Sequence, residues 1–189
     1  MTKIAKTKYA KANCSVMGHF AKDDGITHIN IHSRGKTALG TKLSHFAHSP
    51  FSHPHFGPFY SMEGLWYYLR ACHAKNLEDK KSLERMRYLS GYRAKNFGSL
   101  LPYGWYADFK EDIVAANYQK IIQTPGLQEM VIESSLPFDH YYTFGDNELH
   151  ITPNNYDWLC EGFEQIRSAL KDDVVPLCWI NAEARYTAK

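Results

Sequence analysis

The sequence predicts an α+β protein, a helix-dominated single domain with a few short strands. Apolar residues recur at helical spacing in the longer segments, whereas the alternation that is typical of strands is confined to short ones. The length of 189 residues suits one domain that buries a sizeable core. An apolar fraction of 44% and a charged fraction of 22% are ordinary for a globular protein.

The chain begins with an expected arm and a strand. Residues 1–25 are rich in lysine and alanine, so we expect a mobile or weakly helical arm before a domain over 26–189. THINIHS, residues 27–33, alternates apolar and polar residues and predicts a short half-buried strand. Glycines at 35 and 40 indicate a loop over 34–42. Three prolines between residues 50 and 58 exclude a regular helix there.

The middle of the chain predicts a series of helices. Ser61 is a favoured N-cap, and apolar residues at helical spacing follow it, which predicts a helix over 61–74. The charged segment 75–91 predicts a second helix that ends at Gly91. A long helix is expected from about 108 to 123, and a short one begins with LQEMVIES at 127.

The C-terminal part predicts one strand and one further helix. LPFDHYYTF, residues 136–144, is rich in strand-forming residues. Asn155 is placed to cap a helix over 156–171. The tail, residues 174–189, is expected to add an edge strand or to pack loosely.

Composition excludes several classes of protein. A net charge of +2 provides no strong overall field for nucleic acid. The four cysteines are widely spaced without a CxxC pair, unlike a zinc ribbon, and indicate reduced thiols. No apolar run approaches the ~20 residues of a membrane span, and no apolar segment follows the basic start as in a signal peptide. We therefore expect a cytoplasmic protein with no membrane partner.

The segment SHFAHSPFSHPHFGPFYSME, residues 44–63, holds four histidines before a single acid. Structural zinc sites use regular short spacings, commonly with cysteine, whereas prolines break this segment, so stacking or hydrogen-bonded histidines are favoured over metal ligands. Phosphate-binding glycine loops and a GxSxG elbow are absent from the sequence. Glu63, in the first turn of a predicted helix, fits either dipole complementarity or a reactive carboxylate.

Several short motifs follow one another between residues 29 and 170. They are INIHS at 29–33, LSHF at 43–46 with Pro50-Phe51, GPFYSMEGLWY at 57–67, AKNFG at 94–98, Trp105 with Lys120-Ile121 and TPGL at 124–127, a blurred DHYYTFG at 139–145, and IRSAL at 166–170. In this order they resemble the motifs of the NADAR family, ADP-ribose-related N-glycosidases with the YbiA-like fold.

The chain also departs from the family pattern. His45 stands where the family has asparagine, Ser99 where it has arginine, and the acid near Asp139 is altered. The family lysine four residues after the tryptophan is Phe109 here, with Lys110 beside it. These departures look like a divergent branch of the sort found in bacteriophages, whose proteins would act in the host cytoplasm.

The resemblance implies cleavage of an N-glycosidic bond on ADP-ribose, with no cofactor and no metal. The implied substrate is guanine in nucleic acid, DNA rather than RNA, that carries ADP-ribose left by a DNA-modifying toxin; free ADP-ribose is the product. Such a site needs a carboxylate near the anomeric carbon, a proton donor for the departing base and donors for the diphosphate.

The resemblance also implies roles for individual residues. Glu63 would be the general base or cation stabiliser, Lys95 a phosphate ligand or amine nucleophile, and Asp139 and His140 the second carboxylate and acid/base. The expected substrate-binding residues are Arg34, Lys36, Ser44, His45, Tyr67 and Trp105. Trp105 equally fits core packing, and Asp139 and His140 equally fit the exposed face of a strand.

Two other functions remain open at this point. One is a non-catalytic module that binds ADP-ribose or a related nucleotide, or that inhibits a toxin by surface contact. The other is a plain nucleic-acid-binding protein, which the near-neutral charge disfavours.

Overall fold

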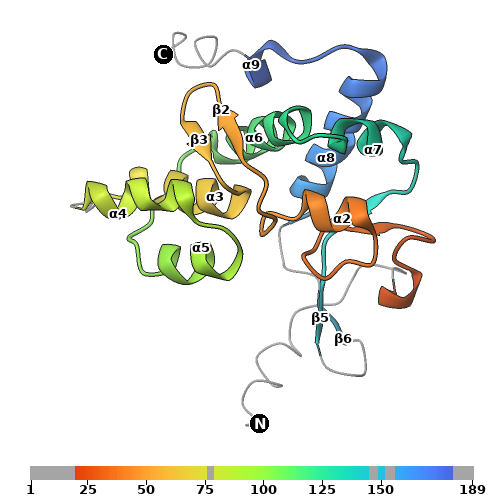
Figure 1. Ribbon diagram of the computed structural model, residues 1–189, viewed down its shortest axis with the longest axis horizontal. Coiled ribbons are helices and arrows are strands. Elements are labelled where there is room, and N and C mark those ends of the chain that lie inside the picture. The colour runs from red at the N-terminus through yellow and green to blue at the C-terminus, as the bar shows by residue number, and fades with distance from the viewer. Residues whose placement is uncertain (1–19, 76–78, 145–148, 152–155, 181–189) are drawn as a thin grey trace.

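The computed structural model describes residues 20–75, 79–144, 149–151 and 156–180. Helices dominate this part of the chain, and three two-stranded sheets complete the domain, which confirms the predicted class (Figure 1). The helices are η1 (Ala21–Asp23), α2 (Ala38–Leu43), α3 (Met62–Cys72), α4 (Lys80–Arg85), η2 (Met86–Tyr88), α5 (Gly91–Gly98), α6 (Phe109–Gln123), α7 (Leu127–Glu133), α8 (Asp157–Asp172) and α9 (Leu177–Ile180). The strands are β1 (Ile29–Asn30), β2 (Phe51–His53), β3 (Gly57–Phe59), β4 (Phe138–Asp139), β5 (Tyr142–Phe144) and β6 (Leu149–Ile151).

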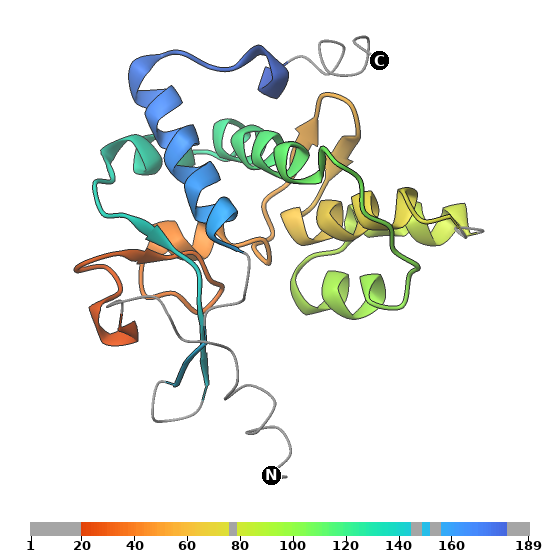
Figure 2. The ribbon, with the colours of Figure 1, turned by 180° about the vertical axis from the view of Figure 1, so that it is seen from behind.

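Helix α6 is the central element of the core. It contacts α3, α7, α8, α9 and β2, and buried residues occur all around it rather than on one stripe. A helix covered on every side in this way must also bury polar residues, and α6 buries Asn117, Gln119 and Lys120. Figures 1 and 2 show α3, α4 and α5 to one side of the molecule and α2, β1, β4 and α8 to the other.

The parallel pair of β1 and β4 brings together segments about a hundred residues apart in sequence. Ile29 pairs with Phe138 and Asn30 with Asp139. The Asn30 side chain then donates to the Tyr141 carbonyl (3.2 Å) and accepts from the Tyr141 amide (3.1 Å). This amide therefore continues the pairing where the backbone ladder stops, and it fixes residues 28–32 beside residues 138–142.

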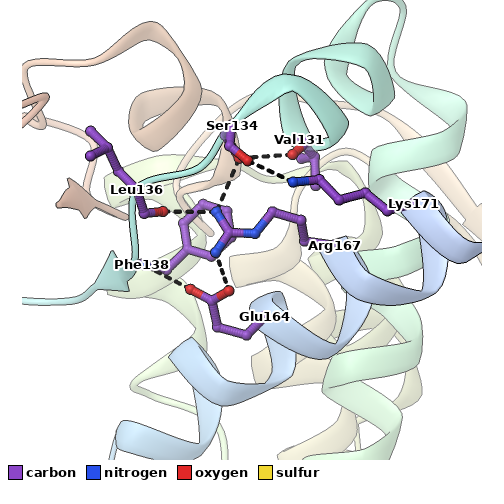
Figure 3. A network of polar contacts seen from close by, with 7 residues as sticks. All are labelled: Val131, Ser134, Leu136, Phe138, Glu164, Arg167 and Lys171. Atoms are coloured by element: carbon purple, nitrogen blue, oxygen red, sulfur yellow. Dashed lines mark hydrogen bonds and ion pairs between the residues drawn. The ribbon is translucent and has the colours of Figure 1, made fainter.

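A polar network attaches α8 to the segment that leads into β4 (Figure 3). Arg167 pairs with Glu164 and donates to the Ser134 hydroxyl (3.2 Å) and the Leu136 carbonyl (2.7 Å). Lys171 donates to the Ser134 carbonyl at 3.0 Å. These bonds satisfy the backbone between α7 and β4, which forms no regular structure of its own.

Several predicted elements are confirmed with small shifts at their ends. The helices expected over 61–74, from 108 to 123, from 127 and over 156–171 correspond to α3, α6, α7 and α8. The strand expected at 27–33 is shortened to β1, with an isolated bridge at His28. Residues 1–19 of the expected arm, and the predicted cap Asn155, lie outside the described residues.

The loop predicted over 34–42 is wrong in its second half, where α2 forms. Thr37 caps this helix by accepting from the Gly40 amide at 2.9 Å, and Leu39 and Leu43 are buried beneath it. A Cβ on Gly40 would lie 2.3 Å from the Asn30 carbonyl oxygen. The glycine therefore permits close packing of the helix on β1 rather than marking a loop.

The single helix predicted over 75–91 is also wrong. Asp79 caps α4 through the Lys81 and Ser82 amides, η2 follows, and Gly91 begins α5 at φ +54° instead of ending a helix. Long-range bonds impose the break, because the Arg87 carbonyl accepts from Tyr60 and the Leu89 carbonyl from Ser61. The spacing of apolar residues within the segment does not predict these long-range hydrogen-bond partners.

Two further predictions at the C-terminal end fail. The strand predicted over 136–144 is split into β4 and β5 at His140 and Tyr141 by the Asn30 side chain. In the described part of the tail, residues 174–180, helix α9 forms instead of an edge strand, because Trp179 is buried against Tyr118 and its carbonyl accepts from Gln119 (2.8 Å). Residues 181–189 lie outside the described residues. Among the described helices, none is long and apolar enough to cross a membrane.

Candidate functional site

The start of α3 holds Glu63 in a fixed position. Ser61 caps the helix, since its hydroxyl accepts from the Gly64 amide (3.0 Å) while donating to the Leu89 carbonyl (2.8 Å). The Glu63 amide donates to the His45 carbonyl at 2.9 Å. These bonds tie the first turn of α3 both to the segment before α5 and to the loop after α2.

Helix α6 holds the loop that receives the Glu63 amide. The fully buried Lys120 ammonium donates to the carbonyls of Leu43 (3.2 Å) and Ser44 (2.9 Å). Asn117, also buried, bonds to His45 Nε2 through its side-chain amide at 3.2 Å. Burial lowers the pKa of Lys120 to about 7, and the two carbonyls lie where its protonated form can donate.

The Glu63 side chain is half-buried and faces one cation. Burial raises the pKa of Glu63 to about 7, against a smaller opposing effect from the charge of Lys95 on α5. Lys95 is exposed and lies over the Phe46 ring, 5.8 Å from its centroid. A carboxylate with this pKa is divided between its two protonation states at neutral pH, which suits acid–base chemistry.

Rings from the other side of the molecule complete the surroundings of Glu63. His32, next to β1, has its ring centroid 5.1 Å from that of Tyr142 and 6.5 Å from that of His140. His140 in turn lies 5.3 Å from Tyr142 and 5.7 Å from Tyr156. Burial first, and the Glu63 charge among the further causes, raises the pKa of Tyr142 to about 12 and raises that of Tyr156.

We call these residues the Glu63 cluster: Glu63, Tyr67, Lys95, His32, His45, Asn117, His140, Tyr142 and Tyr156. Its three histidines, His32, His45 and His140, are neutral at pH 7. Burial lowers the pKa of His32 to about 4 and that of His45 to about 3, and it lowers the pKa of His140 as well. His140 Nδ1 lies 2.7 Å from the Ile31 carbonyl, which requires Nδ1 to carry the proton and leaves Nε2 as an acceptor. Lys95 is therefore the cation whose charge opposes the raised pKa of Glu63.

Three of the four predicted catalytic residues belong to the Glu63 cluster, and the fourth, Asp139, contacts it through His140. Glu63, Lys95 and His140 belong to it through the contacts described above. Asp139 is half-buried in β4 and accepts from the His140 amide at 2.7 Å. Burial, and then the charge of Asp139, raises the pKa of the Cys160 thiol on α8 to about 12, and the same charge opposes the lowered pKa of His140.

Among the predicted substrate-binding residues, some belong to the Glu63 cluster and others lie outside it. Tyr67 and His45 lie beside Glu63 in the cluster, because Glu63 raises the Tyr67 pKa after burial and the His45 carbonyl binds the Glu63 amide. Ser44 is buried, and its hydroxyl accepts from the Phe46 amide at 3.3 Å.

Two further predicted substrate-binding residues, Arg34 and Lys36, lie on the segment before α2. Arg34 is exposed, and its charge contributes, after burial, to the low pKa of His32. Lys36 is exposed, and its amide donates to Asp24 at 2.6 Å to close the loop before α2.

Trp105 is 62% exposed on the segment before α6. Its ring packs edge to face against the buried Phe109 ring, 5.0 Å between centroids. Core packing of Trp105, one of the two alternatives at the sequence level, is therefore wrong.

Sequence reasoning missed several residues of the cluster: His32, Asn117, Tyr142 and Tyr156. Asn117 had no signal, because a polar residue within a predicted amphipathic helix is normally solvent-exposed. His32 and Tyr142 each stood in a segment predicted as a strand, but only the β1–β4 pairing reveals that the two segments adjoin.

The loop histidines stack and hydrogen-bond, as the sequence favoured. His53 Nδ1 accepts from the His55 and Phe56 amides at 3.1 and 3.3 Å, and the His48 ring packs on Tyr60. In the part of the chain that the structure describes, no group of three or more His, Cys, Asp or Glu side chains could hold a metal ion. Compared with known proteins, the chain matches no protein-family model, no curated protein and no solved structure.

Proposed function

We propose that the protein is an N-glycosidase that removes ADP-ribose from modified guanine in nucleic acid. The observation that supports this most is Glu63, a half-buried carboxylate with a raised pKa among tyrosines, neutral histidines and one lysine. The motif order described above is a second, weaker support. Together they support Glu63 as the reactive acid of the proposed reaction.

In the proposed reaction the bond between guanine and the anomeric carbon breaks as positive charge develops on the sugar. Ionised Glu63 would stabilise that charge or accept a proton from the attacking water. Lys95, whose charge opposes the raised pKa of Glu63, would bind the diphosphate as an ammonium group. In the alternative role, Lys95 would first give a proton to ionised Glu63. The free amine would then attack the anomeric carbon while guanine leaves with that proton, and water would hydrolyse the new carbon–nitrogen bond to release ADP-ribose. Asp139 and His140 stay predicted as second carboxylate and acid/base, with His140 able to accept at Nε2.

A non-catalytic ADP-ribose-binding module is the second candidate. It is favoured by Ser99, which stands at the family's arginine position and uses its hydroxyl to bond the Asn96 carbonyl (2.9 Å) rather than to face the cluster. Binding of ADP-ribose without turnover of any modified oligonucleotide would identify this second function.

The proposed function is tested with an oligonucleotide that carries ADP-ribosyl-guanine, by following the mass of the strand. We expect release of ADP-ribose and recovery of the unmodified strand. Glu63→Gln should reduce the rate by ~100-fold or more, because a stabiliser of the transition-state charge is lost.

Glu129→Gln is a matched control for this experiment. Glu129 is also an acid in the first turn of a helix, α7, but it is exposed. Its variant should retain wild-type turnover. Full turnover by Glu63→Gln would remove Glu63 from the mechanism, and no turnover by the wild type would reject the glycosidase.

A further inference from the structure

An arginine lies among three aromatic rings at the C-terminal half of α3. The Arg70 guanidinium carbon is 4.4 Å from the ring centroid of Tyr103, 5.1 Å from that of Trp105 and 5.9 Å from that of Tyr67. Tyr103 and Trp105 are 64% and 62% exposed. We call Arg70, Tyr103 and Trp105 the aromatic platform.

The platform is held rigidly, although it lies on an irregular segment. The Gly104 amide donates to the Arg70 carbonyl at 2.8 Å. A Cβ on Gly104 would lie 2.2 Å from the His73 carbonyl oxygen, so only glycine permits this approach. The next residue, Tyr106, stacks on the His73 ring (3.8 Å between centroids). The backbone that carries the two exposed rings is therefore anchored to α3.

The charge of Arg70 is not neutralised by the surrounding protein. Its Nε is buried and has no hydrogen-bond partner, and over the ranges that the structure describes its side chain forms no ion pair with an acid. A buried donor without a partner is costly and is uncommon in native proteins. The protein therefore leaves the guanidinium charge uncompensated, and an anion that contacts the outer part of this side chain would compensate it. The acceptor that suits a guanidinium beside aromatic rings is a phosphate or a base edge.

The platform is adjacent to the Glu63 cluster. Glu63, Tyr67 and Arg70 are spaced i, i+4 and i+7 on α3, so they share one face, and seven residues of helix advance by about 10 Å. After burial, the pKa of both Tyr67 and Tyr156 is raised by Glu63 and lowered by Arg70, so both tyrosines lie close enough to feel both charges.

We propose that the aromatic platform stacks an unpaired base of single-stranded nucleic acid next to the modified nucleotide. Exposed rings give a base two faces on which to stack, and Arg70 meets the phosphate of the same strand. A duplex hides its base faces, so the platform selects single strands over duplexes. The position of the neighbouring nucleotide depends on the proposed function, whereas the stacking of a base does not.

The test is binding of unmodified, fluorescently labelled single-stranded oligonucleotides, measured by anisotropy. We expect Tyr103→Ala and Trp105→Ala each to weaken binding by about tenfold, because one stacking face is lost. Tyr88→Ala is the matched control, since Tyr88 is 58% exposed but packs on Tyr60 away from the platform. Its affinity should equal that of the wild type.

Salt titration distinguishes the electrostatic contribution of Arg70 to binding from the stacking contribution of the aromatic rings. The slope of log Kd against log salt should fall by about 0.7 in Arg70→Gln and stay unchanged in Tyr103→Ala. The same sequence as a duplex should bind more weakly than the single strand. Equal losses in Tyr88→Ala and Tyr103→Ala, or wild-type binding by both platform variants, would overturn the proposal.

The same experiments distinguish failure of this inference from failure of the glycosidase. Platform-dependent binding by a protein that cleaves no modified oligonucleotide would reject the glycosidase and keep the platform. Cleavage of the modified oligonucleotide without platform-dependent binding would keep the glycosidase and reject the platform.

Discussion

Glu63 illustrates how much one residue's chemistry depends on its surroundings. Its place in the first helical turn alone would favour the ionised form, through the helix dipole. Burial has the larger effect, and the pKa is raised to about 7. The fold therefore keeps a carboxylate that costs free energy to ionise, which is common at reactive sites and uncommon elsewhere.

This raised pKa predicts a pH-dependent stability. Because the folded pKa lies above the unfolded value of 4.5, the contribution of Glu63 is complete below about pH 4.5 and is lost as the pH rises through about 7. Glu63→Gln should therefore gain stability relative to the wild type between pH 5 and pH 8, by at most about 3 kcal/mol. Urea unfolding of both proteins at these pH values measures the difference. A difference that does not change with pH would contradict the raised pKa.

His45 predicts the opposite trend. Its folded pKa of about 3 lies below the unfolded value of 6.5, so its contribution is complete above pH 6.5 and is lost as the pH falls toward 3. His45→Gln, which cannot be protonated and whose amide reaches the position of Nε2 beside Asn117, should lose less stability than the wild type between pH 7 and pH 4. Thermal unfolding at these pH values tests this. His55→Asn, which alters an exposed histidine, should follow the wild type.

At the scale of elements, α3 depends on a buried cap. The Ser61 hydroxyl serves the Gly64 amide and the Leu89 carbonyl together, so Ser61→Ala removes a cap and leaves a buried acceptor unpaired. We expect a loss of about 1–3 kcal/mol in the free energy of unfolding.

Denaturant titration measures the free energy of unfolding of Ser61→Ala and of a control variant, Ser168→Ala. Ser168→Ala alters an exposed hydroxyl of α8 and should change stability by less than about 0.5 kcal/mol. Similar losses in the two variants would mean that the Ser61 bonds contribute nothing beyond an exposed hydroxyl.

At the scale of the whole molecule, the β1–β4 pair brings together the segments that carry His32 and His140. Asn30 is buried and forms two hydrogen bonds with the Tyr141 backbone. Asn30→Ala should leave both backbone groups unpaired and cost about 2–4 kcal/mol. It should also increase amide exchange at residues 138–142, measured by hydrogen exchange with mass spectrometry. Unchanged exchange there would show that β4 does not depend on this bridge.

The helices α3 and α8 could be predicted from the sequence, because each buries one clear apolar stripe, and α3 also begins at a favoured cap. Prediction failed at α2, at the break between α4 and α5 and at α9, where a long-range contact overrides the local pattern. Gly40 is typical: the sequence marks it as a loop residue, whereas the Asn30 carbonyl makes it a packing residue.

For the candidate site, the sequence by itself determined the acid. The position of Glu63 in the first helical turn followed from its own segment, because Ser61 and the apolar residues after it predict where α3 begins. Its role as a reactive acid was implied by the family resemblance and stays a prediction. Only the tertiary structure decided its surroundings: the histidines and tyrosines around Glu63, and the unneutralised charge of Arg70. These properties depend on burial and on distances between segments up to about a hundred residues apart. The local spacing of residues in the sequence predicts neither quantity.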